Sequence, residues 1–265
     1  MEKNTITTLL RGMKLPGIAE GLDRRLAEAQ KRRLGHLEFL ALILQDERVA
    51  RDGNLVRKNI RMAGFGQERT FEGFDFSFNE QHLPRGVVND LRTGEYLSKG
   101  RNVVIAGPPG VGKTHIAKAL GHEACRQKHS VIFRRTGKIF RALATAKSDY
   151  HFERAWKPMV RADLLIFDDF ALRRFEPKEV ELLYNMIEER QGLRSIILTS
   201  NRPTADWLGA FPDQVVGGAI LDRLVAGATK IYVKAQARSY RGTEGITAAS
   251  DDDKITQEAV SEAAV

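Results

Sequence analysis

Apolar residues recur at helical spacing through the first 66 residues of the chain. One set falls at 6–13 and is interrupted by Leu-Pro-Gly at 15–17, a second set falls at 22–29, and a longer one follows at 37–49. Apolar positions three and four residues apart are typical of one face of an α-helix. The pattern predicts a small helical module at the N-terminus.

The pattern changes in residues 70–84, where aromatic residues alternate with acids and glycine. This composition indicates an extended linker that docks on another part of the protein. We therefore place the helical module at 1–69, and the linker with the start of a second domain at 70–98.

From residue 99 onward, short apolar runs alternate with helical segments. Continuous apolar runs separated by helices indicate parallel strands that are buried on both faces. The predicted fold class is α/β, with a core at 99–242. The expected strands are 103–106, 131–133, 164–167, 195–200 and 230–233.

The segment GPPGVGKT at 107–114 fits the phosphate-binding pattern G-x-x-x-x-G-K-[ST] at every fixed position. It lies between a predicted strand and a predicted helix. There its backbone N–H groups, the helix dipole and Lys113 can hold ATP phosphates, while Thr114 offers a hydroxyl to Mg²⁺. The alternative is a turn that binds nothing. The expected nucleotide-binding residues are Gly107, Pro108, Pro109, Gly110, Val111, Gly112, Lys113, Thr114 and His115.

Polar residues end two further predicted strands. Asp168 follows the apolar run LLIF and is placed to hold Mg²⁺ together with Thr114, and Asp169 could polarise the attacking water. Asn201 ends the run SIILTS. It could bond the γ-phosphate or the water if its strand lies between the other two, and otherwise it is a common turn or cap asparagine.

The chain of 265 residues carries a net charge of +8, but the charge is unevenly distributed. Residues 243–265 hold six acids and one lysine, which suggests a disordered tail and leaves a strongly basic body. A basic body favours a polyanionic partner, first of all nucleic acid. Candidate phosphate contacts, each of which could equally be solvated surface, are Arg134, Arg135, Lys138, Arg173 and Arg174.

No run approaches the roughly 18 apolar residues of a membrane span, and the N-terminus has no secretory h-region. These features predict a cytoplasmic protein with no membrane partner.

The segments GPPGVGKTHIAKAL, LLIFDDF, ILTSNRP and ILDRL together resemble AAA+ ATPases, and more narrowly the group of IstB-type transposition helpers and DnaC-type helicase loaders. LPGIAEGL near the start resembles IstB proteins specifically. The resemblance implies an ATPase that assembles as a homo-oligomer on duplex DNA and stimulates a partner transposase. It also implies that Asn201 is sensor 1 and Arg223 an arginine finger supplied in trans.

Only residues 224–242 lie between Arg223 and the acidic tail, too few for the helical lid of most AAA+ members, so a reduced lid is expected, with Arg238 and Arg241 as sensor-2 candidates. The main alternative is a DnaC-like replicative helicase loader, which shares the ATPase core and differs in its partner. A small-molecule P-loop kinase and a protein that binds ATP without hydrolysing it remain further possibilities.

Overall fold

A computed structural model describes residues 3–77, 83–146 and 149–233. It divides into two compact units, an N-terminal unit up to Lys58 and a C-terminal unit from Asn59 onward. The expectations for the tail and for Arg238 and Arg241 fall outside the described residues. None of the described helices combines the length and apolarity needed to cross a bilayer.

The N-terminal unit is helical, as its pattern predicts. It contains α1 (Lys3–Gly12), α2 (Pro16–Arg32) and most of α3 (His36–Ala63). The buried carboxylate of Glu47 on α3 accepts hydrogen bonds from the backbone N–H groups of Gly17 (2.8 Å) and Ile18 (3.3 Å). These are N–H groups of the first turn of α2, which have no partner within their own helix. A side chain of α3 therefore caps α2.

The C-terminal unit is built on one parallel sheet with the strand order β2-β3-β4-β1-β5. The five expected strands are confirmed, and the strand that ends before Asn201 lies between the other two as required. The strands are β1 (Val103–Ala106), β2 (Val131–Arg135), β3 (Leu164–Asp168), β4 (Ser195–Ser200) and β5 (Thr229–Tyr232).

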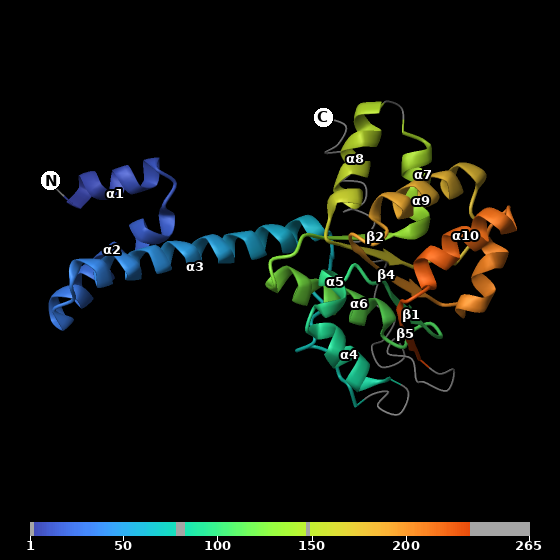
Figure 1. Ribbon diagram of the computed structural model, residues 1–265, viewed down its shortest axis with the longest axis horizontal. Helices are drawn as coiled ribbons and strands as arrows, with labels where there is room; N and C mark the ends of the chain where they lie inside the picture. The colour runs from blue at the N-terminus through green and yellow to red at the C-terminus, as the bar shows by residue number, and fades with distance from the viewer. Residues whose placement is uncertain (1–2, 78–82, 147–148, 234–265) are drawn as a thin grey trace. The chain divides into compact units, whose positions relative to one another are not determined.

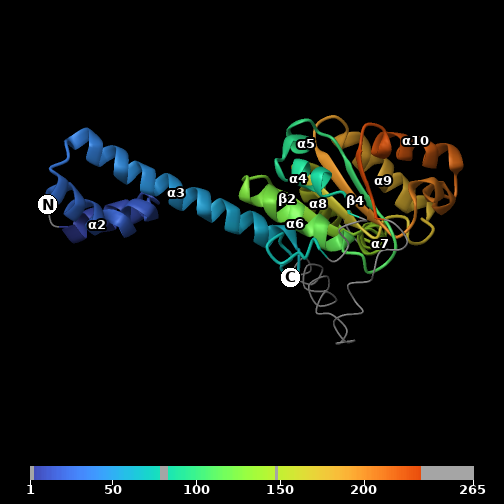
Figure 2. The same cartoon turned by 90° about the horizontal axis from the view of Figure 1, so that it is seen from below.

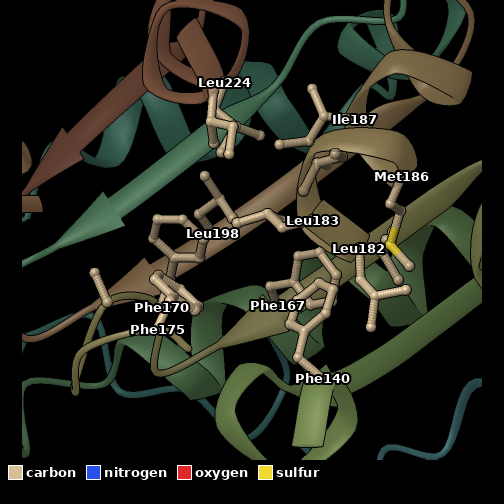
Figure 3. Close-up of a cluster of buried hydrophobic side chains, with 14 of the residues drawn as sticks. Phe140, Phe167, Phe170, Phe175, Leu182, Leu183, Met186, Ile187, Leu198 and Leu224 are labelled. Atoms are coloured by element: carbon tan, nitrogen blue, oxygen red, sulfur yellow. The ribbon is translucent and has the colours of Figure 1, made fainter. Parts of the chain in front are cut away.

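Helices cover both faces of this sheet (Figures 1 and 2). They are α4 (Arg85–Arg92), α5 (Glu95–Ser98), α6 (Lys113–Arg126), α7 (Thr136–Ala144), α8 (Asp149–Arg161), α9 (Pro177–Arg190), the 3₁₀ helix η1 (Thr204–Ala210) and α10 (Gln214–Val225). Alternate residues of β1, β2, β3 and β4 enter two separate apolar clusters. Val104 and Leu198 face α7–α10, whereas Val103 and Ile197 face α4–α6. Figure 3 shows Phe167 and Leu198 from the sheet against Leu183, Met186 and Ile187 of α9.

One fully buried arginine joins α8, α9 and β4. Arg190, the last residue of α9, donates to the carbonyl oxygens of Met159, Val160 and Ala162 at the end of α8, and to that of Ser195 at the start of β4. Burial lowers the pKa of Arg190 to about 9, so the side chain is still a cation at neutral pH. A cation at the last carbonyls of a helix is favoured by the helix dipole.

The last residues of α3 belong to the C-terminal unit. Asn59 donates its amide N–H groups to the carbonyl oxygens of Lys128 (3.2 Å) and His129 (2.9 Å), and Ala63 is fully buried in the cluster under β2. The division between the units therefore falls inside α3, ahead of the boundary that the sequence places at 69/70. Helical periodicity cannot show at which residue of a continuous helix one unit ends and the next begins.

Candidate nucleotide-binding site

The loop 107–114 connects the end of β1 to the start of α6. Its first residue continues the sheet, because the Gly107 N–H donates to the carbonyl oxygen of Ser200 at 3.2 Å. A Cβ atom on Gly107 would lie 2.7 Å from the carbonyl oxygen of Val233, so only glycine fits there. The loop thus has the strand-loop-helix context that a phosphate cradle needs.

Lys113 is the first residue of α6 and is almost fully buried. Its ammonium donates to the carbonyl oxygen of Pro108 at 2.7 Å, so the side chain folds back across its own loop. This cation and the helix dipole at the start of α6 both attract an anion to the loop.

The buried carboxylate of Asp168, at the end of β3, accepts hydrogen bonds from two hydroxyl groups. Thr114 donates to its Oδ1 at 2.8 Å, and Thr199 of β4 donates to the same oxygen. A third threonine, Thr136, donates to the backbone carbonyl of Asp168 at 2.8 Å. A hydroxyl and a carboxylate side by side are hard oxygen ligands of the kind Mg²⁺ prefers, so Thr114 and Asp168 fit the ion predicted from the sequence.

Asp169 sits in a left-handed backbone conformation with φ of +56°. Its backbone N–H donates to the Thr199 hydroxyl oxygen at 3.1 Å, and the following Phe170 N–H donates to the Thr199 carbonyl at 2.8 Å. Non-glycine residues in this region are uncommon, and when found they concentrate at functional sites. The turn after β3 is therefore fixed by β4.

Asn201 follows β4 directly and is held between two anchored neighbours. The indole N–H of the fully buried Trp207 donates to the Ser200 hydroxyl and to the Arg202 carbonyl, both at 3.1 Å. The Ser200 hydroxyl also donates to the Phe170 carbonyl at 2.8 Å. The carboxyl ends of β1, β3 and β4 thus bring the loop, Asp168, Asp169 and Asn201 to one edge of the sheet.

An aromatic group from the predicted linker packs on the loop. Phe74 is buried, and a Cβ atom on Gly112 would lie 3.0 Å from its ring. The His115 ring meets Phe74 edge-on with centroids 4.9 Å apart, and its Nε2 lies 2.9 Å from the Thr70 carbonyl oxygen. Burial lowers the pKa of His115, so the ring is neutral at neutral pH. His115 therefore joins the linker to α6.

Arg223 lies at the amino ends of the strands, opposite the carboxyl ends that carry the phosphate loop. The carbonyl oxygen of Arg223 accepts a hydrogen bond from the Asn102 side chain, which directly precedes β1, while the loop 107–114 follows β1. The guanidinium stacks on Tyr184 and bonds Gln191 at 3.1 Å. It borders a cavity of about 260 Å³. The lining residues are Gly100, Arg101, Asn102, Ile187, Arg190, Gln191, Gly192, Arg194, Ile196, Arg223, Ala226 and Gly227.

The five basic candidates for phosphate contacts with DNA differ in their hydrogen bonds and in their exposure. Arg134 donates to the carbonyls of Ala63 and Phe133, and Arg173 forms an ion pair with the buried Glu179. These internal bonds give both arginines a structural role. The other three candidates differ in exposure. Arg135 is half-buried opposite Asp168 in the β2–β3 register, and Lys138 and Arg174 are exposed.

Sequence reasoning assigned no role to Thr199, Trp207 or Phe74, although all three contact residues of the site. Thr199 and Trp207 could have been suspected from their nearness to Asn201 in the sequence. Phe74 lies in the aromatic segment 70–84, which the sequence predicts to dock on another part of the protein, but its contact with the phosphate loop depends on how distant segments pack.

Comparison with known proteins agrees with this geometry. The family described as IstB-like ATP binding protein matches residues 8–248. An ATP-binding protein of an insertion sequence from Mycobacterium tuberculosis is 37% identical over 233 residues, which cover 88% of this chain and 92% of the relative. The insertion sequence IS21 ATP-binding protein of Pseudomonas aeruginosa is 32% identical over 257 residues, covering 94% and 97%.

Solved structures show the same fold at low identity. DnaI aligns with a TM-score of 0.56 at 17% identity, covering 67% of this chain and 93% of that one. AMPPCP-bound DnaA from Aquifex aeolicus aligns with 0.52 at 23% identity, covering 67% and 53%. These likenesses confirm the α/β fold. Because the family matches residues 8–248, which are most of this chain, the chain belongs to the IstB-like ATP-binding proteins of insertion sequences.

Proposed function

We propose that this protein binds and hydrolyses Mg·ATP, and that ATP controls its assembly on duplex DNA, where it recruits and stimulates the transposase of its insertion sequence. The observation that carries the proposal is the hydrogen bond between Thr114 and Asp168, which joins the phosphate loop after β1 to the acid at the end of β3.

Each residue at this edge of the sheet has a distinct role in the proposal. Lys113 and the N–H groups of the loop bind the phosphates, and Thr114 and Asp168 hold Mg²⁺, which neutralises charge on the phosphate oxygens. Asp169 orients and polarises the attacking water, and Asn201 acts as sensor 1, bonding either that water or the γ-phosphate. Asp168, buried and fixed by two hydroxyls, keeps its position without solvent reorganisation.

Arg223 acts in trans in this proposal. It lies at the edge of the sheet opposite its own phosphate loop, so a neighbouring copy is the natural source of the nucleotide it meets. Arg101 and Arg194 border the same cavity, and no carboxylate is among its described lining residues. Several cations around one cavity suit the charge of a triphosphate.

DNA and the transposase are the proposed partners. The relatives are proteins of insertion sequences, and the body of the chain is basic. Arg135, Lys138 and Arg174 lie near the carboxyl edge of the sheet and are the candidates for phosphate contacts, which give little sequence preference and a steep salt dependence.

The first experiment measures ATP turnover with and without random-sequence duplex DNA, together with DNA binding in ATP, in ADP and without nucleotide. Lys113→Ala should abolish ATP-dependent binding and turnover, whereas Lys157→Ala, a matched loss of an exposed lysine on α8, should leave both unchanged. Turnover and ATP-dependent DNA binding that are equal in Lys113→Ala and wild type would refute the site. If DNA does not change the rate of ATP turnover and no DNA binding is found at low salt, a kinase that phosphorylates a small molecule is favoured instead.

A subunit-mixing experiment tests Arg223. Lys113→Ala and Arg223→Ala proteins should each be inactive alone, but a mixture should regain turnover, because one variant supplies the phosphate loop and the other the arginine. Arg154→Ala, on the exposed surface of α8, serves as the control for loss of an arginine. Failure of the mixture to exceed its components contradicts action in trans.

Co-purification identifies the partner. Recovery of the transposase encoded beside this chain supports the proposal, and recovery of a replicative helicase in its place favours a helicase loader.

A further inference from the structure

We propose that Thr199 is a positioning residue for ATP hydrolysis, because its single hydroxyl fixes both the carboxylate of Asp168 and the turn that presents Asp169. This inference rests on the proposed function, since it concerns how the same site holds Mg²⁺ and water. Thr199 lies on β4, next to β3 in the sheet, and is fully buried.

The first link is to the proposed magnesium ligand. The Thr199 hydroxyl donates to Oδ1 of Asp168, the oxygen that also accepts from Thr114. Two donors on one oxygen fix the rotation of the carboxylate, and neither hydroxyl uses Oδ2. A carboxylate whose rotation is fixed needs less reorganisation when it binds a cation.

The second link is to the turn after β3. The same hydroxyl accepts the Asp169 N–H at 3.1 Å, and the Thr199 carbonyl accepts the Phe170 N–H at 2.8 Å. A left-handed backbone at an aspartate costs free energy relative to the ordinary regions, so it persists only where the surroundings hold it. These two bonds hold Asp169 in that conformation.

One hydroxyl serves both links, because it has one proton to donate and lone pairs to accept. Serine could make the same two bonds, and valine, which has the same shape as threonine, could make neither. This difference in side-chain chemistry allows a clean test at one position.

The test compares Thr199→Val, Thr199→Ser and Thr136→Val with wild type. Thr136 is the matched control, because its buried hydroxyl bonds the backbone carbonyl of Asp168 and does not contact the carboxylate. The first readout is binding of a fluorescent, non-hydrolysable ATP analogue with Mg²⁺ and with EDTA. The ratio of the two affinities is the gain due to magnesium.

We expect Thr199→Val to bind the analogue in EDTA as wild type does, but to lose about tenfold of the magnesium gain, the effect expected from losing one hydrogen bond to a charged group. The kcat for ATP should fall by about ten- to hundredfold, with a much smaller change in KM. Thr199→Ser should restore both the magnesium gain and kcat. Thr136→Val should keep the magnesium gain, even if its melting temperature falls as much as that of Thr199→Val.

Three results would overturn the inference: a wild-type magnesium gain in Thr199→Val, an equal loss in Thr199→Ser, or an equal loss in Thr136→Val. If wild type itself shows neither a magnesium gain nor ATP turnover, the proposed function fails first. If wild type shows both and Thr199→Val matches it, only the role of Thr199 fails.

Discussion

Trp207 offers a sharp test of whether the residues around Asn201 are held as the structure indicates. Its fully buried indole N–H is shared between the Ser200 hydroxyl and the Arg202 carbonyl, each 3.1 Å away, and its ring meets Phe170 edge-on at 4.8 Å between centroids. Trp207→Phe removes the N–H and part of the ring while leaving an aromatic side chain in the same place.

The magnitude follows from these contacts. The Ser200 hydroxyl keeps its bonds to Phe170 and Arg202, but the Arg202 carbonyl loses the indole donor, at a cost of about 1–3 kcal/mol. The space left by the smaller ring adds about 1 kcal/mol. We therefore expect the free energy of unfolding to fall by about 2–4 kcal/mol. ATP turnover should fall at saturating ATP, because Asn201 loses an anchor on each side.

The chain provides its own control, because it contains only two tryptophans. Trp156 on α8 makes one longer bond, 3.3 Å to the Glu189 carboxylate of α9. Trp156→Phe should cost about 1 kcal/mol or less and leave turnover unchanged. It also makes Trp207 the sole tryptophan, so its fluorescence should respond to ATP.

The assays are urea unfolding followed by circular dichroism, and steady-state ATP turnover. If Trp207→Phe is as stable as Trp156→Phe and hydrolyses ATP at the wild-type rate, the indole bonds do not hold Asn201 and the reasoning is refuted.

Four further changes should have measurable effects. Arg190→Met leaves several buried carbonyls without a donor and should lower the free energy of unfolding by about 3–5 kcal/mol in urea, whereas an unchanged midpoint would contradict the anchoring role. Burial opposes ionisation of Glu179, but hydrogen bonds from Arg173 and a backbone N–H hold the pKa of its carboxyl below the usual value. Its stabilising contribution is therefore complete above the unfolded pKa and is lost on acidification, so Glu179→Gln should reduce the loss of stability as the pH falls below about 4.5. Burial lowers the pKa of His122, so that stability should fall as the pH drops below about 6.5, and His122→Phe should flatten this dependence in unfolding curves at several pH values. Phe74→Ala removes the ring that covers the phosphate loop and should cost about 3 kcal/mol of stability, with a smaller rise of melting temperature on adding ATP than wild type shows.

The core of the fold could be predicted because its strands are buried on both faces. Runs such as LLIF at 164–167 have no polar face, and their separation by helical segments leaves a parallel sheet as the simple arrangement. The order of the strands in the sheet cannot be inferred from these apolar runs alone. Only the condition that Asn201 meet the phosphate loop suggested that β4 lies between β1 and β3, and the position of β5 beyond β1 had no signal in the sequence.

The site was predictable where its chemistry depends on local spacing. The phosphate loop and Asp168 are contiguous motifs, so the sequence located them directly. Thr199 and Trp207 act through hydrogen bonds across the sheet, and such bonds follow from packing. The basic residues show the limit of charge as a guide, since Arg134 and Arg173 look like surface cations in the sequence but bond carbonyls and a buried acid in the structure.

The left-handed backbone of Asp169 also restricts which residues evolution can place there. Aspartate, asparagine and glycine adopt this conformation far more readily than longer side chains do. A glutamate would carry the same charge, but it would add strain to the turn and move the carboxylate farther from β3. Substitution by asparagine keeps the backbone and removes the charge, so under the proposed role of Asp169 hydrolysis can be lost in one step without loss of the fold. Among natural relatives with this turn, we expect asparagine at this position to accompany loss of ATP turnover with ATP binding retained.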